Sequence, residues 1–160
     1  PGTSIPVQIV LMIILYLLIF YLLRYRQFGR YIYSIGGNEE ATRLSGINVD
    51  TYKILAYVVC GITAAVASIV MTAKLNSAVP TAGEGYELDA VASSVIGGIS
   101  LTGGVGSVWG TLMGAMIIGV IKNGLNLLNV SSYLQQVVTG LIVIAAVLAD
   151  TFKNKVSNKS

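Results

Sequence analysis

The chain has 160 residues, of which 54% are hydrophobic and only 11% are charged, and its formal net charge is +3. Soluble domains carry about 25% charged residues, so this composition excludes an ordinary soluble domain and predicts a membrane protein. The single cysteine, Cys60, and the lack of histidine exclude a disulfide framework and a Cys/His zinc site, and we predict neither a metal nor a cofactor.

The first apolar run covers residues 5–23 and contains no charged residue. Its length is close to the ~20 residues that a helix needs to cross a bilayer, so we predict a transmembrane helix here. A secretory signal peptide is excluded because its apolar region is shorter and lies at a true N-terminus, whereas Pro1-Gly2 is no natural start. We therefore expect the C-terminal part of a longer polytopic protein.

A charged segment at residues 24–53 separates this run from a second apolar run at residues 54–73. Short loops rich in lysine and arginine remain in the cytoplasm, so we predict that the segment is a cytoplasmic loop. Its basic residues are Arg24, Arg26, Arg30, Arg43 and Lys53. Because they lie beside apolar runs, they indicate membrane topology, and we expect no nucleic-acid partner.

Three further apolar runs follow at residues 88–101, 107–122 and 133–149. The first of these is short for a full crossing. A loop with acids, glycines and Pro80 comes before it, and we place this loop on the opposite side of the membrane from the charged segment. The fold class that we predict is an all-α polytopic membrane protein with about five transmembrane helices, one of them short or broken.

The basic tail decides how 88–101 is counted. Lys153, Lys155 and Lys159 favour the cytoplasmic side, which requires an even number of crossings after residue 53. A crossing at 88–101 satisfies this requirement. The alternative is a re-entrant segment that would leave the tail outside.

Glycines recur every four residues at Gly106, Gly110 and Gly114. Small residues at this spacing let helices approach closely in lipid, where dispersion rather than water exclusion holds them together. We predict that these three glycines serve helix packing.

The charged segment contains the signals of one short helix over residues 39–45. Asn38 is a suitable N-cap, Glu39 and Glu40 lie in the first turn, Arg43 lies near the end, and Gly46 can terminate the helix. Such a helix is only ~10 Å long and is marginal in isolation, so it must rest on other structure.

The apolar face of this short helix is small, consisting of Ala41, Leu44 and Ile47. A surface helix lying in the headgroups needs a wider apolar stripe. We therefore favour docking into a groove of a soluble partner over simple contact with the membrane surface.

Three segments resemble the membrane permease subunit of bacterial ribose-type ABC importers. They are GRYIYSIGGNEEATRLSGINV, PTAGEGYELDAVASSVIGGISLTGG and NGLNLLNVSSYLQ, and the likeness covers nearly all of residues 29–150. The resemblance implies a permease for ribose or a related monosaccharide in the bacterial cytoplasmic (inner) membrane. It also implies three partners in the bilayer or beside it: ABC ATPase subunits, an extracytoplasmic sugar-binding protein and a second permease subunit, expected to be an identical copy.

In that family the loop matching residues 36–47 resembles the coupling helix, which sits in a cleft of the ATPase. The resemblance therefore assigns ATPase coupling to Arg30, Asn38, Glu39, Glu40, Arg43, Leu44 and Gly46. Glu39 and Arg43 are also spaced to form an i,i+4 ion pair that stabilises the helix itself. Both roles are compatible.

The segment after Gly85 supplies candidate translocation-path residues, namely Tyr86, Glu87, Asp89, Ser93 and Ser94. The serine hydroxyls could contact a sugar or bond back to helix carbonyls, and the second is commoner. Glu87 and Asp89 are expected at the membrane edge, where they could cap a helix that begins near Ala90, because mid-membrane acids are costly. Trp109 and Lys122 suit interfacial positions, and we assign them no function.

We predict a transporter subunit rather than an enzyme, with no catalytic residues, because the sequence lacks a histidine base, a Cys/His pair and a GxxxxGK[ST] phosphate loop. Two other classes stay open. An ion-coupled secondary carrier would place ionisable groups inside its spans, which are almost free of charge here. A purely structural membrane subunit would not need the capped charged helix. Within the importer family, the sequence does not fix the sugar.

Overall fold

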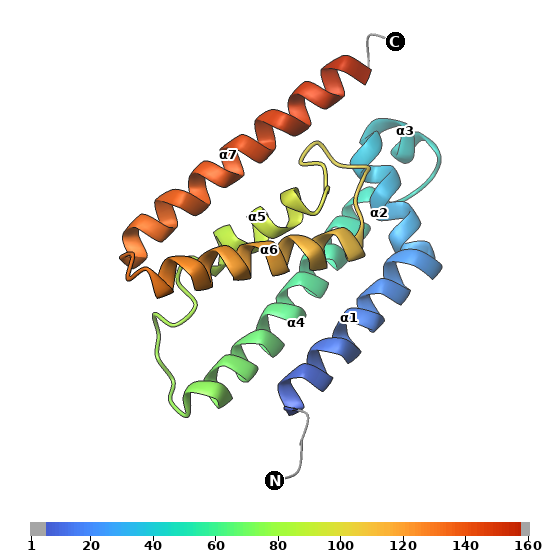
Figure 1. Cartoon of the computed structure of the whole chain (residues 1–160). Coiled ribbons are helices and arrows are strands. Elements are labelled where there is room, and N and C mark those ends of the chain that lie inside the picture. The colour runs from blue at the N-terminus through green and yellow to red at the C-terminus, as the bar shows by residue number, and fades with distance from the viewer. Residues whose placement is uncertain (1–5, 158–160) are drawn as a thin grey trace. The chain divides into compact units, whose positions relative to one another are not determined.

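The described part of the chain is all-α, as the apolar runs predicted. The computed structural model describes residues 6–157, and within that range it has seven helices and no strand (Figure 1). The helices are α1 (Val7–Tyr25), α2 (Gln27–Gly37), α3 (Glu39–Leu44), α4 (Val49–Leu75), α5 (Tyr86–Ile96), α6 (Val108–Leu127) and α7 (Ser132–Ser157). Residues 1–5 and 158–160, and the side chains of Lys153 and Lys155, lie outside the described part, so the structure does not test the predictions on the chain start and the basic tail.

Three helices are long and apolar enough to cross a membrane. The best windows of α1 and α4 have a mean hydropathy of 2.4 with no buried residue, and that of α6 has 1.4. A shorter apolar stretch, Ser132–Leu148, lies in α7. So much uncovered apolar surface is expected of helices that face lipid or other protein. The polytopic membrane class is therefore confirmed, although only three of the five predicted spans pass these criteria of length and composition.

The chain divides into two compact units, Pro1–Gly83 and Glu84–Ser160. In the first unit, α2 packs against α1, α3 and α4. At its start a Cβ on Gly29 would collide with the Leu23 carbonyl, so α2 begins in close contact with the end of α1. The rings of Tyr31 and Tyr52 meet edge to face at 4.9 Å between centroids and join α2 to the first turns of α4.

The charged segment 24–53 is mostly helical. It comprises α2, α3 and the first turns of α4, which begins at Val49 rather than at residue 54. The helix therefore runs without a break from the charged segment into the apolar run. This continuity makes α3 and α4 neighbours both in sequence and in contact.

In the second unit, α5 packs against both α6 and α7. A Cβ on Gly110 would lie under 3.0 Å from the carbonyl group of Gly97, and a Cβ on Gly114 would lie equally close to the carbonyl of Ser93. The backbones of α5 and α6 thus touch where these glycines lie, as small residues allow in membrane helices. Ala92, Ser93 and Val95 of α5 are buried there.

Helix α5 is shorter than the predicted span 88–101. Its 11 residues rise ~16 Å, about half of a ~30 Å hydrocarbon core. It also begins at Tyr86, four positions before the expected start near Ala90, because Gly85 takes the N-cap position with φ +85°. Glu87 and Asp89 consequently lie within the first turn, where the helix dipole favours acids, and do not cap the helix.

Candidate functional site

Helix α3 is closed at both ends by the residues that the sequence indicated. Asn38 Oδ1 accepts a hydrogen bond from the Ala41 N–H at 2.9 Å, which is an N-cap. Gly46 has φ +82° and donates its N–H to the Arg43 carbonyl at 3.0 Å. The left-handed conformation at this position favours glycine. The helix ends at Leu44, one residue earlier than predicted.

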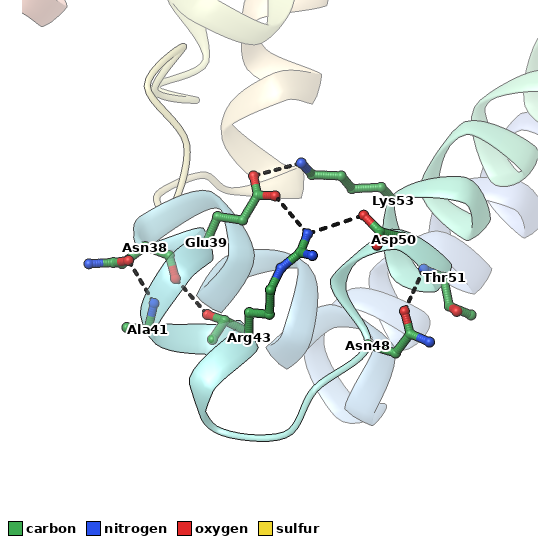
Figure 2. Close-up of polar contacts among 9 residues, drawn as sticks. Asn38, Glu39, Ala41, Arg43, Asn48, Asp50, Thr51 and Lys53 are labelled. Atoms are coloured by element: carbon green, nitrogen blue, oxygen red, sulfur yellow. Dashed lines mark hydrogen bonds and ion pairs between the residues drawn. The ribbon is translucent and has the colours of Figure 1, made fainter.

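The first turn of α4 is capped in the same way, which sequence reasoning missed. Asn48 Oδ1 accepts from the Thr51 N–H at 3.3 Å, and Asp50 lies in the first turn (Figure 2). The signal was present, because Asn before an apolar run with an acid two residues later is typical of a helix start. Val49 is only 1% exposed, and Ile35 of α2 and Thr42 of α3 are buried too. Each of the three helices therefore supplies one buried side chain.

Four charged side chains of alternating sign join α3 to α4, and we call them the α3–α4 charge network (Figure 2). Lys53 Nζ lies 2.6 Å from Glu39 Oε2. Arg43 Nη2 lies 3.5 Å from Glu39 Oε1 and 3.3 Å from Asp50 Oδ1. Two residues one turn apart on α3 thus meet two residues three apart on α4, which fixes the rotation of α3 as well as its distance.

The network has one electrostatic consequence that the structure resolves. The hydrogen bond from Lys53 lowers the pKa of Glu39 below its ordinary value of 4.5, and the positive charges of Lys53 and Arg43 lower it further. Partial desolvation opposes the shift. The side chains of the network are 45–69% exposed, so each pair contributes little stability by itself. The ion pairs of the network instead orient α3 relative to the first turns of α4.

The other face of α3 is uncovered within the first unit. Leu44 is 84% exposed, Ala41 and Glu40 are exposed, and Ile47 is half-buried. Arg30, the remaining residue of the predicted coupling set, lies on α2 and is exposed. The structure therefore brings together residues 38–46, which we call the α3 platform, and leaves Arg30 on the neighbouring helix α2.

The second unit holds an ion pair that the sequence did not predict. Lys122 of α6 donates to Asp89 Oδ2 of α5, and these side chains are only 29% and 19% exposed. The other carboxylate oxygen, Asp89 Oδ1, is buried and has no hydrogen-bond partner among the described residues. Ionisable groups within membrane segments are generally paired, and Asp89 in the first turn of α5 and Lys122 in α6 follow this pattern.

The candidate path residues fall on two faces of α5. Tyr86, Asp89 and Ser93 are spaced by three and four residues and share one face, which meets α6 at Lys122 and Gly114. Ser93 is only 7% exposed. Glu87 and Ser94, seven residues apart, share another face, on which Glu87 is exposed and Ser94 is half-buried with its hydroxyl donated to the Ala90 carbonyl.

The three predicted packing glycines do not occupy equivalent positions. Gly110 and Gly114 lie on α6 against the backbone of α5. Gly106 precedes α6, and a Cβ there would lie 3.1 Å from the side chain of Ile99. Trp109, which the sequence predicted at the membrane–water interface, is half-exposed in the first turn of α6.

Comparison with known proteins supplies the family. Residues 2–147 match the family described as the permease component of branched-chain amino acid transport systems. The chain is 53% identical over 150 residues to the ribose import permease protein RbsC of Escherichia coli (strain K12), covering 94% of this chain and 47% of that protein. It is 49% identical over 151 residues to the protein of the same name from Bacillus subtilis (strain 168), covering 94% and 47%.

A third relative has a different named sugar. The chain is 43% identical over 152 residues to the xylose transport system permease protein XylH of Haemophilus influenzae (strain Rd), covering 95% of this chain and 40% of that protein. The chain thus spans about half the length of the curated relatives it matches. No solved structure was found to match it significantly.

Proposed function

Because the chain belongs to this family of transport-system permease components, we propose that it forms the membrane permease of an ATP-binding-cassette sugar importer. The sugar would be ribose or a related monosaccharide, since relatives 49–53% identical are ribose import permeases. Family membership and the three candidate spans make the chain an integral membrane protein of the transporter class rather than an enzyme. Its place in the bacterial cytoplasmic membrane is part of the proposal.

The observation that carries the proposal is the platform formed by α3. Leu44 is 84% exposed on a helix of six residues that cannot be stable alone. The α3–α4 charge network and the buried Val49 hold this helix on the first turn of α4, one of the candidate spans. A groove on a cytoplasmic ATPase that received Leu44 could therefore push or pull α4 through the direct contacts between α3 and α4.

Coupling in this sense is a bias between two states of the permease. The ATPase changes conformation with its nucleotide, and it can shift the permease only if it binds the inward-open and outward-open states with unequal affinity. Arg30, Asn38, Glu39, Glu40, Arg43, Leu44 and Gly46 are the residues that we assign to this contact or to its support.

A pair of matched leucines tests the proposed contact. Leu44→Asp on α3 is compared with Leu128→Asp at the end of α6, where the leucine is 75% exposed. We expect Leu44→Asp to reduce co-purification of the ATPase subunits with the permease at least tenfold, because a carboxylate would enter an apolar groove. Leu128→Asp should leave co-purification unchanged. Equal retention in both variants would remove α3 from the interface.

Topology is the second requirement, because the platform must face the cytoplasm. Cys60 is the single cysteine of the chain, so the experiment starts from Cys60→Ala, which makes each introduced cysteine the only thiol. A membrane-impermeant maleimide applied to intact spheroplasts should modify Glu84→Cys, in the loop predicted on the outer side, and should spare Glu40→Cys until the cells are broken. Modification of Glu40→Cys in intact spheroplasts would contradict the proposal.

The translocation path is proposed to pass the exposed face of α5. Glu87 and Ser94 share this face. Tyr86, Asp89 and Ser93 share the neighbouring face, on which Asp89 and Ser93 meet α6, and we propose that this face borders the path as well. Gly110 and Gly114 would hold α5 in register with α6, and Gly106 would shape the loop that joins them. The sugar-binding protein and a second, identical permease subunit complete the proposed assembly.

One observation favours an ion-coupled carrier as the second candidate function. Lys122 lies within the candidate span α6 and pairs with Asp89, so this part of the chain is less free of charge than the sequence suggested. Ion-coupled carriers use ionisable groups in their spans. Sugar uptake in cells depleted of ATP with intact ion gradients distinguishes the two functions. Uptake through an ABC importer ceases under these conditions, whereas uptake through an ion-coupled carrier continues.

A further inference from the structure

The Asp89–Lys122 pair is more than the packing of α5 requires. The close backbone contacts at Gly110 and Gly114 already seat the C-terminal part of α5 on α6. The N-terminal part of α5 meets α6 through Asp89 and Lys122, which have opposite charges and side chains that are each less than a third exposed. Partly buried ion pairs are poor stabilisers compared with apolar side chains of the same size. A purely mechanical contact at this position would be met as well by two apolar residues.

The hydrogen-bonding capacity of the pair is only partly used. Lys122 carries three N–H donors, and the structure shows one of them bonded, to Asp89 Oδ2. Asp89 Oδ1 accepts no hydrogen bond from the described residues. A buried acceptor without a donor is costly unless some group supplies one. The pair therefore offers a carboxylate oxygen and ammonium hydrogens side by side.

We propose that the Asp89–Lys122 pair binds a hydroxyl group of a neutral polyhydroxy solute as it passes through the permease. A hydroxyl donates one hydrogen bond and accepts others, so it matches an acceptor and a donor that lie together. The pair has no net charge and therefore favours a neutral solute over an ion of either sign. The proposal rests on the proposed function and names the contact that a sugar would make.

Access requires little movement. Oδ1 is hidden in this conformation, but about a fifth of the Asp89 side chain and more than a quarter of that of Lys122 are exposed. The two oxygens of a carboxylate are equivalent, and rotation about the last side-chain bond exchanges them. Such a rotation places Oδ1 in the position beside Lys122, so a solute at the exposed side of the pair meets a carboxylate oxygen next to the lysine ammonium.

The surroundings of the pair are polar as well. Asn126 lies one turn after Lys122 on α6, and its Oδ1 accepts from Gln135 Nε2 of α7 at 2.8 Å. Gln135 is only 8% exposed, and it also donates to the Val130 carbonyl at 2.9 Å. The two amides thus join α6 to α7 at the end of the unit where α5 and α7 begin and α6 ends, one helical turn beyond Lys122.

The test replaces the pair in two ways that differ only in hydrogen bonding. The apolar pair, Asp89→Leu with Lys122→Met, fills the space without donors or acceptors. The amide pair, Asp89→Asn with Lys122→Gln, is uncharged but keeps both. Each is assembled with its ATPase and sugar-binding protein in proteoliposomes, and the initial rate of ATP-driven uptake of radiolabelled ribose is measured together with the thermal unfolding midpoint.

We expect the apolar pair to unfold at or above the wild-type midpoint and to lose uptake at least tenfold, and the amide pair to keep uptake within about fivefold. Uptake by the apolar pair within twofold of wild type would overturn the inference and would show that the Asp89–Lys122 pair has only a structural role. If the apolar pair fails to assemble, the amide pair decides, because a folded amide pair without uptake would also overturn it. A wild-type complex that takes up no sugar would overturn the proposed function instead, and this inference with it.

Discussion

The two units contain ion pairs of opposite character. In the α3–α4 charge network, four side chains share three contacts at 2.6–3.5 Å and remain 45–69% exposed. In the second unit, one lysine and one aspartate meet alone, with 29% and 19% of their side chains exposed and one oxygen unpartnered. Water competes with the first set and hardly with the second.

The difference teaches what each arrangement can do. Exposed pairs exchange partners at small cost, so a network of them orients a helix yet adapts when that helix is pushed. A secluded pair cannot lose one member without leaving a charge in a poorly solvated place. We therefore expect the network to serve a moving contact and the Asp89–Lys122 pair to serve a fixed site.

The sharpest test of this contrast removes one lysine from each unit. Lys122→Met should destabilise the second unit by about 3 kcal/mol, because Asp89 would be left partly buried without its partner, and should lower the unfolding midpoint by roughly 10 °C. Lys53→Met should change the midpoint by less than about 2 °C, since water replaces the lost partner. Intrinsic fluorescence during heating in detergent measures both variants. Equal midpoints would break the comparison.

Packing also differs between glycines within the spans, and substitutions measure that difference. Gly114→Leu should cost about 1–3 kcal/mol or more, because its Cβ would meet the Ser93 carbonyl and separate α5 from α6. Gly61→Leu on α4 and Gly119→Leu on α6 meet open space within the described residues and should be nearly neutral. The yield of monodisperse protein and the unfolding midpoint report the result. A tolerated Gly114→Leu would mean that α5 does not press on α6.

The end of α3 gives a smaller effect that concerns function more than stability. Gly46 has φ +82° and no neighbour within 4 Å of an added Cβ, so strain alone decides the outcome. Gly46→Val should cost about 1–2 kcal/mol and loosen the platform, whereas Gly46→Asn should be milder because asparagine tolerates this conformation. We expect sugar-stimulated ATP hydrolysis of the assembled complex to fall in the order glycine, asparagine, valine. Identical hydrolysis in all three would separate α3 from coupling.

Local signals in the sequence were sufficient for α3. Asn38, Gly46 and the acids of the first turn each stabilise backbone groups within about four residues of themselves. The observed helix ends within one residue of the predicted one. The contacts of this helix with α4 could not be predicted in the same way. Arg43 reaches Asp50 and Lys53 reaches Glu39 only because the turn at 45–48 brings the helices together.

The second unit was harder for the opposite reason. Apolar periodicity indicated spans, but the length of α5 depends on Gly85 and on the glycines after Ile96, which end the helix early. Lys122 could be taken for an interfacial anchor because nothing local shows that Asp89, 33 positions away, approaches it. A lysine inside an apolar run was nevertheless a signal, since such a residue in a span is expected to have a partner.

The smallest effect concerns the protonation of Glu39, and it tests whether the network exists as drawn. Lys53 and Arg43 lower the pKa of Glu39 below 4.5, so their contribution to stability is present above the unfolded-state pKa and is lost as the pH falls through the lowered folded-state value. Carbon-13 NMR of the Glu39 carboxyl in nanodiscs should show this depressed pKa. Lys53→Met should raise it toward 4.5, while Lys74→Met, on the last turn of the same helix, should leave it unchanged. A carboxyl that titrates identically with and without Lys53 would show that α3 is free of α4 in the membrane, and the platform would then lose the contact that orients it.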